Sequence, residues 1–236
     1  MSATGYLVFA RCVGFVLRAP GFSHPSVPRI ARAGLALALT LAIVPSLAAV
    51  ARDGMLLVIA LVVEFALGSA MGLAASLLYD GAYAGGRLID DYVGVKAIAP
   101  NIDLVAPSGF GRVWSMAFTG GFFVLGAYAP ALSQFRASFD RIPPGGIPDV
   151  HAWLPFIVSF AASIAGVALA VAGPALGLAF VSQIALAAIA RAVPRFSTFT
   201  LSFAIVFAVV LAMTAIGVAL TFARAAHPLP LMPRFQ

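Results

Sequence analysis

The feature that most constrains this chain is its series of long apolar runs, several of which are as long as a membrane crossing. The clearest lie at 55–79, 113–132, 152–190 and 199–223. With 62% of its 236 residues hydrophobic and only 9% charged, the chain has more apolar surface than a soluble domain of this size can bury. Unbroken apolar runs of this length indicate helices, since lipid cannot satisfy backbone groups. We therefore expect an all-α membrane protein.

Six or seven hydrophobic helices are expected, in a single membrane domain that takes in residues 1–236. The first apolar run, at 4–17, is short for a full crossing. Three prolines and three arginines then predict a non-helical, basic connection at 18–32. The next span is predicted at 33–51, and Pro45 is expected to kink its far end.

Prolines and glycines also divide the second half of the chain. The sequence PPGGIP predicts a polar, irregular connection at 133–151. The run at 152–190 is about 40 residues long, which at ~1.5 Å per residue is too long for one crossing. Gly173 and Pro174 lie near its middle, so they predict the turn of a helical hairpin.

A polar, glycine-rich segment at 80–112 interrupts the apolar runs, and it holds half of the chain's acidic residues. Lipid cannot satisfy irregular backbone, so this segment must lie in water, in protein or beside an aqueous path. Its first part, 80–95, fits a helix that would put Arg87 beside Asp90 and Asp91. Its second part, 99–111, contains two prolines and two glycines, which predict a loop.

Polar residues within or beside the apolar runs are the candidate functional groups. An unpaired Glu64 in such a run costs of order 2–3 kcal/mol, so it should face protein or water. Two interpretations stay open: a contact with a pore or partner, or an ion pair with an arginine such as Arg11. Gln183 is expected to make an interhelical hydrogen bond. The groups expected to face a channel or a partner are Glu64, Arg87, Asp90, Asp91, Gln183 and Arg191.

Small residues and the search for chemistry point to a structural role. Gly68 and Gly72 lie on a small-residue face that lets another helix approach closely. The three histidines are far apart and match no metal-ligand spacing, and no hydrolase elbow or phosphate-binding loop is present. We therefore expect a protein that is not an enzyme, with no catalytic residue, metal or cofactor, and with no nucleic-acid partner.

Three stretches together carry a resemblance to a known family. The first, RCVGFVLRAPGFSHPSVPRIARAGLALAL, begins at Arg11, the second is GGRLIDDYVG at 85–94, and the third lies at 174–203. In this order the chain resembles the FliR/SctT family of the type III secretion export apparatus. It departs from the family's pattern at Gln183, where an acid is usual, and at Arg195, where glutamine is common.

The resemblance implies a fold and a function. Members pack as bent helical hairpins with homologous subunits around a central channel in the bacterial inner membrane, through which unfolded proteins are exported. It implies a structural and gating subunit, in a flagellum or in an injectisome that serves virulence, with export-gate subunits, exported proteins and lipids as its partners. A loop after the central hairpin helps to plug the closed channel. The plug candidates here are Pro100, Ile102, Val105, Pro107, Phe110 and Gly111.

The alternative function is that of a small-solute permease or channel. Such a protein predicts internal repeats with paired broken helices, whereas this sequence shows one Gly-Pro break and no duplicate. An intramembrane enzyme is disfavoured because no serine and histidine both lie inside apolar runs. Basic residues are nearly balanced between alternate connections, so they leave the topology open.

Overall fold

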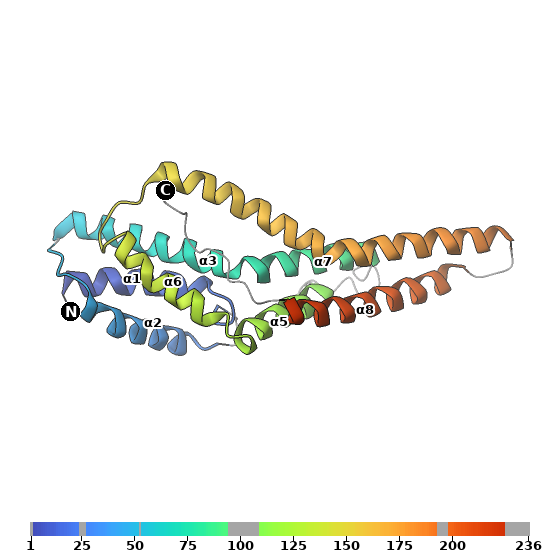
Figure 1. Ribbon diagram of the computed structural model, residues 1–236, viewed down its shortest axis with the longest axis horizontal. Helices are drawn as coiled ribbons and strands as arrows, with labels where there is room; N and C mark the ends of the chain where they lie inside the picture. The colour runs from blue at the N-terminus through green and yellow to red at the C-terminus, as the bar shows by residue number, and fades with distance from the viewer. Residues whose placement is uncertain (1, 24–26, 52, 94–108, 193–197, 225–236) are drawn as a thin grey trace. The chain divides into compact units, whose positions relative to one another are not determined.

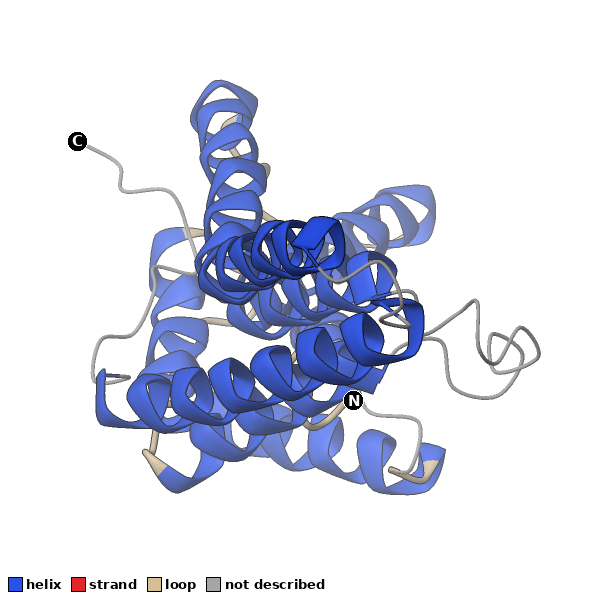
Figure 2. Ribbon diagram, turned by 90° about the vertical axis from the view of Figure 1, so that its right-hand side faces the viewer, coloured by secondary structure: helices blue, strands red, loops and turns tan. Residues whose placement is uncertain are grey.

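The computed structural model describes residues 2–23, 27–51, 53–93, 109–192 and 198–224, and these are almost wholly helical (Figure 1). Within those ranges the ribbon contains helix and loop and no strand, as Figure 2 shows. The expected all-α fold is thereby confirmed. The elements are α1 (Ala3–Arg18), α2 (Arg29–Ile43), the short 3₁₀ helix η1 (Val44–Ser46), α3 (Gly54–Val93), α5 (Gly109–Val124), α6 (Tyr128–Arg141), α7 (Val150–Ala192) and α8 (Thr198–Arg224).

Three helices of the described chain are long and apolar enough to cross a membrane, at Arg29–Ser46, Gly54–Val93 and Trp153–Ala192. The bent pair of α5 and α6 is a fourth candidate. These residues form two compact units, which divide α3 after Leu77, α5 after Gly121 and α7 after Ala161. The first unit holds α1, α2, α6 and the N-terminal parts of α3 and α7. The second holds α8, most of α5 and the C-terminal parts of α3 and α7.

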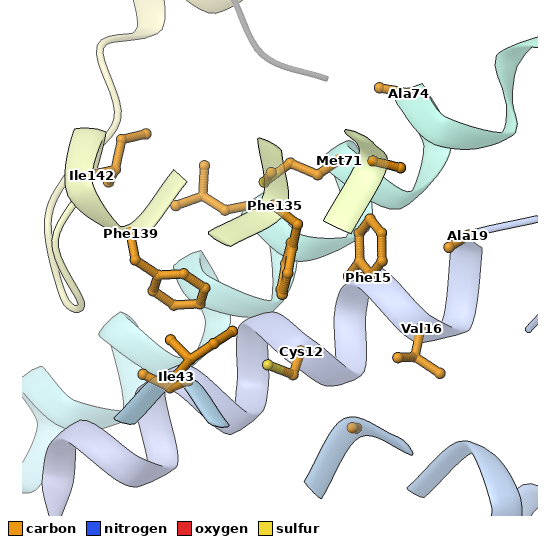
Figure 3. Close-up of a cluster of buried hydrophobic side chains, with 14 of the residues drawn as sticks. Cys12, Phe15, Val16, Ala19, Ile43, Met71, Ala74, Phe135, Phe139 and Ile142 are labelled. Carbon is orange, nitrogen blue, oxygen red and sulfur yellow. The ribbon is translucent and has the colours of Figure 1, made fainter. Parts of the chain in front are cut away.

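The core of the first unit is built around α1, which contributes Val8, Cys12 and Phe15 to a cluster with side chains of α2, α3 and α6 (Figure 3). The ring of Phe15 stacks on that of Phe135, with 4.4 Å between the centroids. Phe135 in turn meets Phe139 edge to face. The first apolar run of the sequence is therefore a helix packed in protein.

Two predicted connections in the first unit are shorter than expected. The predicted connection at 18–32 is wrong at its end, because α2 already begins at Arg29. Pro28 directly precedes that helix, where its missing N–H removes no helical hydrogen bond. The predicted connection at 133–151 is also wrong, since α6 continues to Arg141. Its buried residues are spaced as one face of a helix, which the polar composition concealed: Ala131, Phe135, Ser138 and Phe139.

Two predicted spans end or break early. The span at 33–51 is wrong beyond η1, because α2 ends at Ile43 and Pro45 lies in the 3₁₀ turn. Pro45 has no N–H to donate to the preceding turn. The run at 113–132 is divided between α5 and α6. Gly126 lies at the break with a φ of 73°, a backbone conformation that favours glycine.

The hairpin predicted at 152–190 is wrong, because α7 is one helix from Val150 to Ala192. Pro174 interrupts a single backbone hydrogen bond, and a proline inside a helix can kink it without ending it. The preceding residue is Gly173, which has no Cβ to clash with the proline ring. The apolar residues on both sides still need their intrahelical bonds, so the helix continues.

The core of the second unit consists of small and aromatic side chains contributed by α3, α5, α7 and α8. Phe110 of α5 and Ile89 of α3 lie in one cluster with Ala175 of α7 and Val206 of α8. A second cluster surrounds Trp114. The helix predicted at 80–95 extends to Val93 and is continuous with the apolar run before it.

Candidate functional site

Each unit has one candidate site built on a buried carboxylate of α3: Glu64 in the first unit and Asp90 in the second. Glu64 is 0% exposed, and it pairs with Arg11 of α1, which is 1% exposed. Nε of Arg11 donates to Oε2 of Glu64 at 2.5 Å, and Nη2 donates to Oε1 at 3.0 Å. This two-pronged geometry suits the planar guanidinium and makes the strongest kind of ion pair. Of the two interpretations left open by the sequence, the structure shows the pair with Arg11.

The other hydrogen-bonding groups of this ion pair bind α6 and the turn that follows it. Arg11 donates to the Ser138 hydroxyl at 3.2 Å and to the Ile142 carbonyl at 2.9 Å. The Gly145 N–H donates to Oε1 of Glu64 at 2.7 Å. The guanidinium also lies over the ring of Phe139, 4.2 Å from its centroid. The pair therefore fastens α1, α3 and the α6–α7 connection to one another.

Glycines explain how α1 and α3 come close enough for this pairing. A Cβ on Gly68 would collide with the Arg11 carbonyl group, whose carbon it would approach to 2.8 Å. A Cβ on Gly72 would lie 2.6 Å from the Phe15 carbonyl oxygen, and one on Gly14 would lie 2.8 Å from the Ser69 nitrogen. Glycine on both helices thus lets the two backbones touch.

The second carboxylate binds the start of α5. Asp90 is 2% exposed, and its two oxygens accept hydrogen bonds from the N–H groups of Phe110 at 3.1 Å and Gly111 at 3.3 Å. These are the second and third residues of α5, whose N–H groups have no partner within the helix. A carboxylate here also interacts favourably with the positive end of the helix dipole. Asp90 therefore caps a helix to which it does not belong.

Phe110 and Gly111 were predicted to lie in a loop, and this prediction is wrong, because Gly109–Gly111 form the first turn of α5. Phe110 is 6% exposed, and its ring lies 5.8 Å from that of Phe207. A Cβ on Gly86 would lie 2.5 Å from the Gly111 nitrogen, so α3 and α5 touch backbone to backbone. The other plug candidates lie outside the described residues: Pro100, Ile102, Val105 and Pro107.

The structure separates the remaining predicted groups. Arg87 and Asp91 lie on the exposed side of α3, whereas Asp90 between them is buried. Gln183 and Arg191 are exposed on α7. Sequence reasoning missed the Gly145 N–H and the Ile142 carbonyl, because main-chain groups leave no mark in a sequence. The PPGG turn at 143–146 was the available signal.

Chemistry at these sites is limited to hydrogen bonding and charge pairing. No group of three or more potential metal ligands gathers among the described residues. The Cys12 thiol lies in α1, which is not among the helices that could cross a membrane, and burial raises its pKa to about 11. Both carboxylates bind groups of the protein itself, and this geometry supports a positioning role.

Comparison with known families agrees with this picture. The model of the family described as bacterial export proteins, family 1, matches residues 3–229, which is nearly the whole chain. A comparison with curated proteins gave no match. Since the family match extends across both units and both carboxylate sites, the chain belongs to the bacterial export proteins, family 1, the FliR/SctT family that its sequence resembles.

Proposed function

We propose that this export-apparatus protein is a structural and gating subunit of the type III secretion export gate in the bacterial inner membrane. In this role it packs with other export-gate subunits and helps to form the channel through which unfolded proteins are exported. The family match supports the export role. The structural observation that supports a need for partner subunits is the length of the exposed apolar surface.

Large apolar side chains are exposed along nearly all of α7. Leu154 is 65% exposed near its start, Phe180 is 58% exposed, and Ile189 is 47% exposed near its end. The stretch of α7 from Leu154 to Ile189 amounts to about 50 Å of helix, at ~1.5 Å per residue. The exposed apolar residues of α3 extend over a similar length, from Met55 to Leu88.

One crossing of a bilayer does not cover a helix of this length. The hydrocarbon core of a bilayer is about 30 Å thick. About 50 Å of helix is longer than one crossing of this core, even at the largest usual tilt of about 40°. Apolar surface beyond the core would face water unless protein covers it. Neighbouring subunits of the export gate are the covering that this function supplies.

The first test is native mass spectrometry of the protein purified in mild detergent from its own host. A fixed assembly with other apolar helical subunits is expected, and their identity tells whether the apparatus is flagellar or an injectisome. A monomer or homodimer that recruits nothing would contradict the proposal and favour a permease. A matched pair of variants sharpens the test. Ile189→Gln, at the end of α7, should reduce co-purification, whereas Ile147→Gln, 87% exposed in the α6–α7 connection, should not.

Gating is proposed for the segment 100–111, together with channel- or partner-facing roles for the exposed Arg87, Asp91, Gln183 and Arg191. The first turn of α5 supplies the fixed end of that segment, so a deletion should stop short of Gly109. Removing 102–107 is expected to make the closed membrane leak ions while the assembly still purifies intact. Unchanged conductance in an assembled deletion variant would refute the plug.

A further inference from the structure

The first turn of α5 is held against α3 at three points, and all three come from one face of α3. Gly86, Ile89 and Asp90 follow the spacing i, i+3 and i+4, which places them together on a helix. Gly86 lets the two backbones touch, and Ile89 shares a buried cluster with Phe110. Asp90 accepts the N–H groups of Phe110 and Gly111. The position of this turn is therefore set by α3.

Of the three contacts, the hydrogen bonds to Asp90 can be removed with least change in packing. A helix is normally capped by a side chain immediately before its first turn, which accepts from the second or third N–H group. Here the acceptor is 20 residues earlier in the chain and on another helix. The cap therefore joins two elements, and its loss weakens their junction as well as the start of α5.

Resting on the proposed function, we propose that Asp90 is a positioning residue of the export gate. Its carboxylate fixes the first turn of α5, and with it Phe110, in the position that belongs to the closed gate. Loss of the acceptor shifts the balance away from that position. A typical loss of an N-cap changes such a balance by about fivefold.

The hydrogen bonds are tested directly by amide hydrogen exchange on the assembled complex. Asp90→Leu keeps the branched outline of the side chain, with the same number of heavy atoms, and removes both acceptors, so exchange at Phe110 and Gly111 should become about fivefold faster. Asp90→Asn keeps one oxygen acceptor and replaces the other with an NH2 donor, so slow exchange should return at one of the two amides and not at the other. Asp91→Leu is the matched control on the exposed side of α3, and it should leave these amides unchanged. Equal exchange in Asp90→Leu and wild type would overturn the cap.

The gating role is tested by the ion leak through closed assemblies in vesicles. Asp90→Leu should raise the leak about fivefold with its partner subunits still bound, and Asp90→Asn, which keeps one of the two hydrogen bonds, should raise it less. A leak in Asp90→Asn as large as in Asp90→Leu would show that the charge matters and not the cap, and would overturn the proposal. So would an assembled Asp90→Leu variant with a wild-type leak.

A second variant serves where Asp90→Leu does not assemble. Phe110→Leu shortens the side chain that anchors the same turn and keeps the cap, so it should also raise the leak. A wild-type leak in assembled Phe110→Leu would overturn the gating role. Failure of the wild-type chain to recruit partners would overturn the proposed function and the gating role together, whereas the exchange measurement still decides whether Asp90 caps α5.

Discussion

Arg11→Met tests whether the buried ion pair holds the first unit together. The substitution leaves the Glu64 carboxylate 0% exposed and without its partner. Breaking a buried pair from one side costs about 3–5 kcal/mol, because the remaining charge is left uncompensated. Since every 1.4 kcal/mol is a factor of ten, the equilibrium for opening the unit should rise roughly 100- to 4000-fold.

The chain carries its own probe for this measurement. Cys12 is its single cysteine, and it is 0% exposed in the core beside Arg11. At neutral pH the buried thiol stays protonated, because its pKa is about 11, so a maleimide reagent reaches it only when the unit opens. The labelling rate in mild detergent, followed by mass spectrometry, therefore reports the stability of the first unit.

Two further variants decide what the result means. Arg11→Met combined with Glu64→Gln leaves no buried charge and keeps an acceptor for the Gly145 N–H, so it should recover about 1–3 kcal/mol. Arg136→Met breaks the exposed pair with Asp140, whose side chains are 37% and 66% exposed, and should cost less than about 1 kcal/mol. The reasoning is refuted if Arg11→Met labels within fivefold of Arg136→Met, or if the double variant is no more stable than the single one.

Substitutions at three glycines test the backbone conformation and the close helix contact, and the first two use the same thiol assay. Gly68→Ala forces a Cβ against the Arg11 main chain and should destabilise by about 1–3 kcal/mol, whereas Gly34→Ala on the open side of α2 should stabilise by about 0.5–1 kcal/mol. Equal effects at the two sites would contradict the close approach of α1 and α3. Gly126→Ala meets no neighbouring atom, but the φ of 73° should cost it about 1–2 kcal/mol. Gly126→Asn should be milder, since asparagine tolerates this conformation, and thermal unfolding in detergent compares the two.

Sequence reasoning predicts the helices correctly where long apolar runs determine the structure. Glu64 shows how far such reasoning reaches: its cost in an apolar run requires a partner, and Arg11 is a rare cation in another run. Choosing between that pair and a pore contact needed the structure, because the two residues are 53 positions apart. Asp90 and Asp91 carry the same charge, and only the direction of each on α3 separates the cap from the exposed group.

Prolines and main-chain groups account for most of what sequence reasoning missed. Pro174 was expected to end a helix, yet the neighbouring residues keep α7 continuous, whereas Pro45 does lie at the end of α2. The two prolines have the same chemistry, and the apolar length that follows each one makes the difference. The partners of Glu64 and Asp90 include backbone N–H groups, which every residue except proline possesses.

That both carboxylates of α3 hold main-chain groups has a consequence for how this protein can change over evolutionary time. A main-chain N–H group does not depend on the side chain of its own residue. Side chains that make no contact of their own in the bound segments can therefore change without loss of these hydrogen bonds. At Gly145 there are two constraints: an N–H donor, which proline lacks, and a φ of 77°, which favours glycine. Exposed side chains in the bound segments can therefore vary, while positions 64 and 90 must keep an acceptor for these N–H groups.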